Sequence, residues 1–165
     1  MEEGLLDISF GIKPVNMEKF IFIPLATCYM MLLANKNNFL AHKSAVSFKD
    51  LANERFIMLS SEYKSRQLTI EHCMKSGFIP NIFFTASQTD LIIELVALNK
   101  GIAILPVPDS LRVAKYIDEV SAVSIQDPPF IIEIGFIISR RRSLNYITNT
   151  LINYTLKFFK DKKWG

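Results

Sequence analysis

Two short groups of polar side chains lie where the sequence pattern changes from strand to helix. Ser60-Ser61 follows the apolar segment Phe56–Leu59, and Ser87-Gln88-Thr89 stands between the segment Asn81–Thr85 and an apolar helical pattern. Hydroxyl groups and the open backbone N–H groups of a helix N-terminus are suited to bind a carboxylate or a phosphate. The candidate ligand-binding residues here are therefore Ser60, Ser61, Ser87, Gln88 and Thr89.

Helix capping is the alternative role of these residues. Ser87 and Asp90 have the S-x-x-D spacing of a capping box, in which each side chain satisfies a donor of the first helical turn. Ser60 or Ser61 can cap the preceding helix in the same way. Asp90 also disfavours an anionic ligand, because its carboxylate competes for the same donors. The sequence leaves capping and ligand binding open.

The segment Phe84–Pro108 predicts one strand-helix-strand unit of an α/β fold. Apolar residues of its helix repeat at helical spacing, and those expected to face the core are Leu91, Leu95 and Leu98, with Ile92 and Val96 widening the face. Asn99-Lys100-Gly101 ends the helix. The run Ile102–Leu105 is too apolar and too short for a strand with one exposed face, which favours a parallel sheet covered on both faces.

Strands and helices alternate along the rest of the chain. Further strands are predicted at Leu6–Ile12, Lys19–Ile23, Thr27–Ala34, Phe56–Leu59, Asn81–Thr85, Val120–Ile125 and Phe130–Ser139. Helices are predicted near Phe48–Ala52, from Ser60 or Ser61 to Ser76, shortly after Pro108, and at Leu144–Lys160. The second of these is expected to bury Tyr63, Ile70, Cys73 and Met74, and the last to bury Leu144, Ile147, Leu151, Tyr154 and Phe158.

The composition is that of a protein with an apolar core. Of the 165 residues, 50% are hydrophobic and 13 are Phe, which excludes a disordered chain. The acidic start, Glu2-Glu3, is unlike a secretory signal, and Pro24 interrupts the apolar run Phe20–Ala34, so buried strands are favoured over a membrane helix. We therefore expect a cytoplasmic protein with no membrane partner.

Residue types that carry catalysis or hold metals are sparse. Cys28 and Cys73 lack a C-x-x-C spacing and are expected to be inert buried thiols, which indicates no metal site. His42 and His72 are expected to be surface residues. No catalytic triad, P-loop or dinucleotide fingerprint can be assembled, so neither an enzyme nor a cofactor is predicted.

Four pieces of the sequence resemble one bacterial family, the LysR-type transcriptional regulators. LVALNKGIAILP, which ends at Pro106, resembles the family's "lVaaGlGiallP", and the LDISFGI segment ending at Ile12 resembles its "lDiai" strand. Phe39-Leu40-Ala41 with the following VSFKDLA and RFI resembles "HPLA…vsl.dLa…pfi", and GFIP ending at Pro80 resembles "gf.P". Along the chain the pieces occur in the family's order at plausible spacings, and the resemblance extends over nearly the whole chain; Asn38 and Phe39 replace the usual His-Pro.

This resemblance implies a periplasmic-binding-protein-like (type 2) two-lobed α/β fold with one lobe complete and the other partial. Residues 1–25 would form part of lobe I and the first crossover, 26–126 lobe II, and 127–165 the return to lobe I with the C-terminal helix. An effector would lie between the lobes. Lys13 stands where several relatives carry a basic effector-binding residue, and Thr27 lies near a crossing strand. A solvated lysine and a threonine facing a strand neighbour are the alternatives.

The function implied is that of an effector-binding regulatory domain that senses a small anionic metabolite. The family's helix-turn-helix and linker helix, with the first part of lobe I, would precede residue 1, so DNA contact is expected only through them. An incomplete lobe would leave a sheet edge and an apolar face uncovered, which predicts self-association. A stand-alone solute-binding protein and an enzyme of the same fold are the alternatives.

Overall fold

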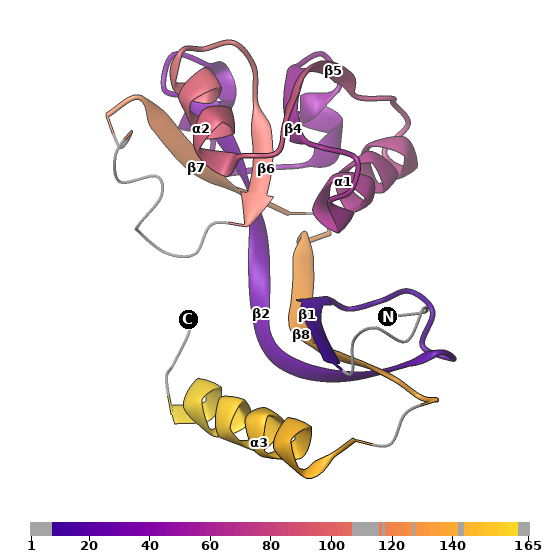
Figure 1. The fold of residues 1–165 in the computed structure, drawn as a ribbon. Coiled ribbons are helices and arrows are strands. Elements are labelled where there is room, and N and C mark those ends of the chain that lie inside the picture. The colour runs from indigo at the N-terminus through magenta and orange to yellow at the C-terminus, as the bar shows by residue number, and fades with distance from the viewer. Residues whose placement is uncertain (1–7, 107–115, 117, 127, 142–143, 162–165) are drawn as a thin grey trace. The chain divides into compact units, whose positions relative to one another are not determined.

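The computed structural model describes residues 8–106, 116, 118–126, 128–141 and 144–161 (Figure 1). The predicted helix after Pro108 and residues 6 and 7 of the first predicted strand lie outside this range. The elements are β1 (Ile8–Ile12), β2 (Phe20–Asn35), the 3-10 helix η1 (Phe39–His42), β3 (Ala45–Val46), the 3-10 helix η2 (Phe48–Leu51), β4 (Arg55–Leu59), α1 (Lys64–Lys75), β5 (Asn81–Ala86), α2 (Thr89–Ala97), β6 (Ala103–Pro106), β7 (Val120–Ile125), β8 (Ile131–Ser139) and α3 (Tyr146–Asp161).

The chain divides into two compact units. Unit 1 contains residues 1–28 and 131–165, and unit 2 contains residues 29–130. The chain passes from unit 1 to unit 2 within β2 and returns at the start of β8.

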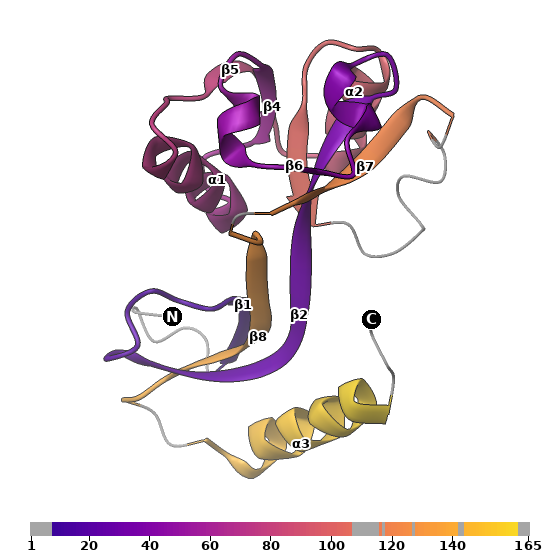
Figure 2. The same ribbon diagram turned by 180° about the vertical axis from the view of Figure 1, so that it is seen from behind.

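Unit 2 contains the larger core. β4 and β5 form a parallel pair, while the second half of β2 pairs antiparallel with β6 and β7, and β3 adds to β7 in parallel. Helix α2 packs against β4, β5, β6 and β7, and α1 packs against β4 and η2 (Figures 1 and 2). The buried core between α2 and these strands includes Leu33, Ile57, Leu59, Ile92, Val96 and Leu105.

Helix α2 forms as predicted, and part of its predicted apolar face is confirmed: Ile92 and Val96 are buried, and Leu95 packs against the core. Ile92, Ile93 and Val96 are buried, whereas Leu91 is 38% and Leu98 61% exposed. The core cluster thus receives the three β-branched side chains of Ile92, Ile93 and Val96, and the buried side of the helix includes Ile93 in place of Leu91 and Leu98. At the end of the helix Asn99 adopts a left-handed φ of 54°.

Two strand predictions are corrected by pairing. β6 is buried as predicted, but its main neighbour is antiparallel β2, and one bridge from Phe56 to Ile102 supplies the parallel contact. The two strands predicted on either side of Pro24 are a single strand of 16 residues. The fixed φ of proline is compatible with an extended strand, so Pro24 does not end β2. The strand pairs through other residues, because proline has no N–H group to donate.

Helix α1 starts at Lys64, later than predicted, and buries Ser65, Thr69 and Cys73. Of the predicted core stripe only Cys73 is buried, while Met74 is 60% exposed. The Thr69 hydroxyl donates to the Ser65 carbonyl (2.9 Å) within the helix. Gly77, with a φ of 92°, ends the helix as predicted.

Unit 1 is built on the antiparallel pair of β1 and β8, and β8 also neighbours β2. Gly135 is required in β8 because a Cβ there would overlap the Ile23 carbonyl of β2. α3 contributes Ile152 to a small core with Phe136 and Ile138. The predicted stripe of α3 is wrong: Ile147, Leu151, Tyr154 and Phe158 are exposed, and only Leu144 of that set packs on this core.

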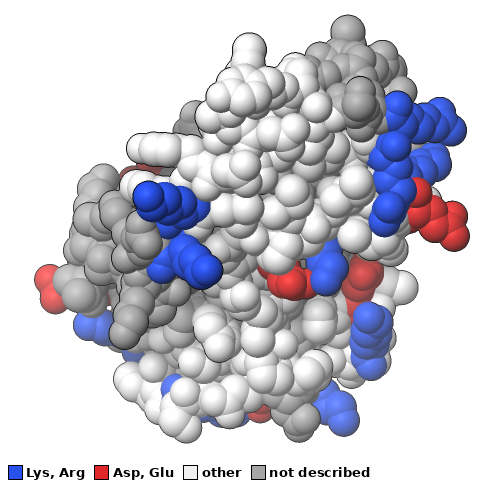
Figure 3. Space-filling model, turned by 90° about the horizontal axis from the view of Figure 1, so that it is seen from below, with Lys and Arg blue, Asp and Glu red and all other residues white. Residues whose placement is uncertain are grey.

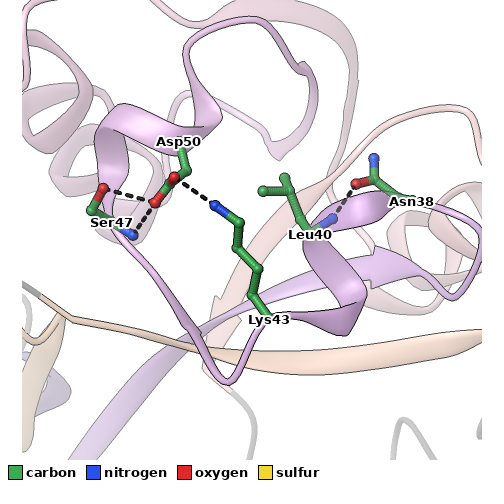
Figure 4. Close-up of polar contacts among 5 residues, drawn as sticks. All are labelled: Asn38, Leu40, Lys43, Ser47 and Asp50. Carbon is green, nitrogen blue, oxygen red and sulfur yellow. Dashed lines mark hydrogen bonds and ion pairs between the residues drawn. The ribbon is translucent and has the colours of Figure 1, made fainter.

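The polar turn between β2 and η2 is held by side-chain bonds to the backbone (Figure 4). The Asn38 side chain accepts from the Leu40 N–H (2.9 Å) and thereby caps η1, at the position where the family pattern has histidine. The Asp50 carboxylate accepts from the Ser47 N–H (2.7 Å) and hydroxyl (2.8 Å) and pairs with Lys43 at 2.7 Å. These bonds hold the pKa of Asp50 at about 2, with Lys43 the main cause and Ser47 the second.

Within the described ranges, none of the helices combines the length and the apolar character needed to cross a bilayer.

Candidate functional site

The carboxyl ends of β4 and β5 meet in register in unit 2. Leu59 pairs with Ala86 at the last position of both strands, and the Ser60 N–H donates to the Ala86 carbonyl at 3.0 Å. In parallel sheets, the residues that follow such strand ends form the usual ligand-binding edge. The two polar groups singled out in the sequence therefore lie together.

A hydrogen bond joins these groups directly. The hydroxyl oxygens of Ser60 and Ser87 are 2.8 Å apart, and the Tyr63 hydroxyl donates to the Ser87 carbonyl at 3.0 Å. Ser61 and Gln88 are exposed beside them, and Thr89 is half-buried at the first position of α2. The edge thus presents several hydroxyl groups and the start of a helix at one place.

Arg66 adds a positive charge to this edge. Its guanidinium donates to the Leu59 carbonyl (2.8 Å) and to the Thr85 hydroxyl (3.2 Å), so it is fixed across the ends of β4 and β5. The sequence reasoning did not single out Arg66 and placed Tyr63 in an apolar stripe. The sequence did carry one signal for this arrangement. Ser60, Tyr63 and Arg66 follow one another at intervals of three residues, a spacing that places side chains on the same side of a helical turn.

The predicted capping box at α2 is not formed. The N-cap residue is Gln88, whose side chain makes no capping bond, and the Ser87 hydroxyl bonds Ser60 instead. The first N–H groups of a helix have no partner within the helix, so this terminus can present donors to a ligand. Asp90 is exposed on the same turn and opposes a second negative charge.

Lys13 and Thr27 belong to unit 1. Lys13 follows β1, is 46% exposed in its side chain, and forms an ion pair with Glu133 at 2.6 Å. Thr27 is exposed on β2. Lys13 is therefore paired with a carboxylate on β8.

The cysteines and histidines occupy ordinary structural positions. Burial raises the pKa of the Cys73 thiol to about 12, which makes it unreactive, and Cys28 is half-buried. His42 is exposed as predicted. His72 is half-buried: the centroid of its ring lies 4.9 Å from that of Phe48, on which it stacks, and 4.5 Å from that of Phe130. Among the described residues, no group of three or more His, Cys, Asp and Glu is placed to hold a metal ion.

Curated relatives are transcriptional regulators. The chain is 26% identical over 163 residues to the uncharacterized HTH-type transcriptional regulator YwbI of Bacillus subtilis, which covers 98% of the chain and 53% of YwbI. It is 27% identical over 106 residues to the DNA-binding transcriptional dual regulator OxyR of Escherichia coli, covering 64% of the chain and 35% of OxyR. Two of these regulators match nearly the whole chain, and the chain spans about half of their length.

Solved structures share the fold. The effector-binding domain of QuiR in complex with shikimate has a TM-score of 0.81 at 18% identity, covering 97% of this chain and 75% of QuiR. The regulatory domain of CcmR from Synechocystis PCC6803 in complex with 2-PG has a TM-score of 0.82 at 19% identity, covering 98% and 77%. The predicted periplasmic-binding-protein-like type 2 fold is confirmed. The model of the LysR substrate binding domain matches residues 1–160, and the chain belongs to that family.

Proposed function

We propose that this chain is the sensing part of a LysR-type transcriptional regulator and binds a small anionic metabolite at the carboxyl edge of β4 and β5. The observation that carries the proposal is the Ser60–Ser87 hydrogen bond at the ends of two parallel strands, with Arg66 fixed across the same strand ends by the Leu59 carbonyl. The fold likeness to QuiR bound to shikimate and CcmR bound to 2-PG supports a small ligand.

The charges at this edge favour a carboxylate or a phosphate. A guanidinium offers planar donors that match both groups, and Arg66 is held in place by Leu59 and Thr85 before any ligand arrives. The hydroxyls of Ser60, Ser61 and Ser87, with Gln88 and Thr89, would supply further polar contacts. Asp90 in the first turn of α2 disfavours a second negative charge beside it.

Other parts of the proposal rest on the family resemblance. Lys13 and Thr27 stay candidate effector contacts. The effector would favour one arrangement of the domain, and a helix-turn-helix elsewhere in a longer protein would transmit the change to DNA in the cytoplasm. A ligand can shift such an equilibrium only by its difference in affinity for the two arrangements. The chain itself would act without catalysis.

A thermal-shift screen with small carboxylates and phosphates tests the site. A bound compound raises the Tm of the wild-type chain, and the rise is lost in Arg66→Gln and reduced in Ser87→Ala and Thr89→Ala. Arg140→Gln is the matched control, because Arg140 also donates to a backbone carbonyl, that of Met17, but lies in unit 1. A rise of equal size in Arg66→Gln and wild type would move the site elsewhere.

A further inference from the structure

The amino end of β2 and the carboxyl end of β8 bring basic residues together in unit 1. Lys19 directly precedes β2, and Arg140 and Arg141 directly follow β8. The Arg140 N–H donates to the Lys19 carbonyl at 3.0 Å, so the two strand ends lie side by side (Figures 1 and 2). All three residues are exposed. Three cations from distant parts of the sequence are therefore held at one place.

A small cavity opens at these strand ends. It has a volume of about 270 Å³ and is lined by Lys19, Phe20, Ser139 and Arg141. The lining thus offers an ammonium group, a guanidinium group, a hydroxyl group and an aromatic wall, and its described residues include no Asp or Glu. A concave surface with charges of one sign concentrates ions of the opposite sign. The cavity is therefore suited to an anion.

The side chain of Arg141 keeps its hydrogen-bonding capacity for a ligand. Figure 3 shows Lys and Arg side chains in groups, several of them beside Asp or Glu, and Lys13 with Glu133 is one such ion pair. Arg141, by contrast, forms no ion pair with any residue that the structure describes. Its N–H donates to the Ser139 hydroxyl oxygen at 3.4 Å, and that hydroxyl keeps its own hydrogen for another acceptor. Both side chains can therefore donate to an anion.

We propose that this cavity binds a phosphate group, either as inorganic phosphate or as part of a small phosphate ester. A guanidinium matches two phosphate oxygens with parallel N–H donors, and the ammonium group of Lys19 adds a second positive charge for a dianion. Pockets for drug-sized ligands measure roughly 300–1,000 Å³, so a cavity of about 270 Å³ suits a smaller anion. The site shares no residue with the β4 and β5 edge of unit 2 and does not rest on the function proposed there.

The neighbouring charges favour a single phosphate group over nucleic acid. Glu18 lines an adjacent hollow together with Arg140, whose Nε donates to the Met17 carbonyl at 3.2 Å. An acid beside the cavity disfavours a long polyanion. Proteins that bind DNA make several phosphate contacts, on the order of six to ten, whereas three cations meet at these strand ends.

Titration calorimetry with inorganic phosphate and with glycerol phosphate, in low-salt buffer, tests the site. At least one of these probes is expected to bind the wild-type chain. Arg141→Gln and Lys19→Gln should each weaken its binding roughly tenfold or more, because each removes a charged donor from a different strand end. Lys157→Gln is the matched control, since Lys157 is an exposed cation of unit 1 on α3. Circular dichroism checks that the variants fold, and the probe that binds more tightly identifies the source of the phosphate group.

The Arg66→Gln variant separates this site from the proposed effector site. Binding that is retained in Arg66→Gln and lost in Arg141→Gln supports the inference, as do two binding events of which each variant removes one. Binding that is lost in Arg66→Gln alone would place the phosphate at the β4 and β5 edge, which would overturn the inference and leave the proposed function intact. Binding of neither probe would also overturn it.

A short DNA duplex is the last probe in this experiment. If the duplex binds, Arg141→Gln abolishes that binding, and neither phosphate compound binds, then the basic group contacts nucleic acid and the inference is wrong. A duplex that does not compete with bound phosphate agrees with a site for a small anion.

Discussion

Helices α2 and α3 are both rich in apolar residues at helical spacing, yet they use their surfaces differently. In α2, three β-branched side chains are buried against a core contributed by several strands. In the 16-residue helix α3, Ile152 and Thr148 are buried among the side chains that the structure describes, and larger apolar residues are exposed. The comparison teaches that periodicity identifies an amphipathic helix, whereas the number of elements beside the helix decides which apolar side is covered.

The largest expected effect is a contrast between two isoleucines. Ile92 in α2 is fully buried and Ile147 in α3 is 76% exposed. Ile92→Ala should destabilise unit 2 by about 2–5 kcal/mol, because it leaves a cavity in a packed core. Ile147→Ala should change the stability of the monomer by less than about 0.5 kcal/mol.

Urea unfolding at low protein concentration measures both values. Equal losses in the two variants would mean that the side of α3 around Ile147 is covered within one chain, and the contrast between the helices would disappear. Leu91→Ala is a useful third variant, since Leu91 was expected to face the core but is 38% exposed.

A smaller effect is expected from the strand glycines of unit 1. Gly135→Ala places a methyl group against the Ile23 carbonyl and should cost about 1–3 kcal/mol. Gly11→Ala is its control on the paired strand, because the nearest atom, Cδ1 of Ile137, would lie 3.6 Å from the added methyl group and in ordinary contact with it. Thermal unfolding compares the two, and a Gly135→Ala protein as stable as wild type would contradict the close pairing of β8 with β2.

The pH dependence should distinguish unit 2 from unit 1. Burial against Phe48 and Phe130, with Lys75 as a second cause, lowers the pKa of His72 from 6.5. The unfolded chain therefore takes up the proton more readily, and stability falls as the pH drops through the unfolded value near 6.5. Hydrogen exchange should show weaker protection of β4 at pH 5 than at pH 7.5, with β8 much less affected. The same loss in His72→Gln would remove His72 as its cause.

The smallest expected effect concerns Asp50. Its pKa of about 2, against 3.8 for an unperturbed carboxyl, means that its contribution is present above pH 3.8 and is lost as the pH falls toward 2. Asp50→Asn should cost on the order of 1 kcal/mol near neutral pH, since the Lys43 pair is partly exposed and the remaining bonds resemble a helix cap. Thermal melts that differ between the two proteins at pH 7 but converge near pH 2 would agree with this assignment.

Local pattern predicted most of the elements but not their faces. The strands ending at Leu59, Ile125 and Ser139 and the helix end at Gly77 are where the sequence placed them. The pattern S-x-x-D occurs twice near predicted helix starts, and only Ser47-Asp50 forms its local bonds. Ser87 instead bonds Ser60, a residue 27 positions away that no local pattern could select.

The candidate site was predictable in its polar residues and not in its charge. Ser60 and Ser87 were placed at strand ends from the sequence, and the parallel register of β4 with β5 brings them together. Arg66 joins them because α1 begins at Lys64 and turns its third residue toward the strand ends. A helix start shifted by a single residue would have directed that side chain elsewhere.

By itself the sequence determined the family, the α/β fold class and the positions where strands give way to helices, because these depend on the types and spacing of neighbouring residues. The tertiary structure decided that β6 runs beside β2, that Arg66 lies across two strand ends, and that the apolar stripe of α3 faces outward. Each of these depends on contacts between residues far apart in the chain, whose energies are set by packing and register and leave no periodic trace in the sequence.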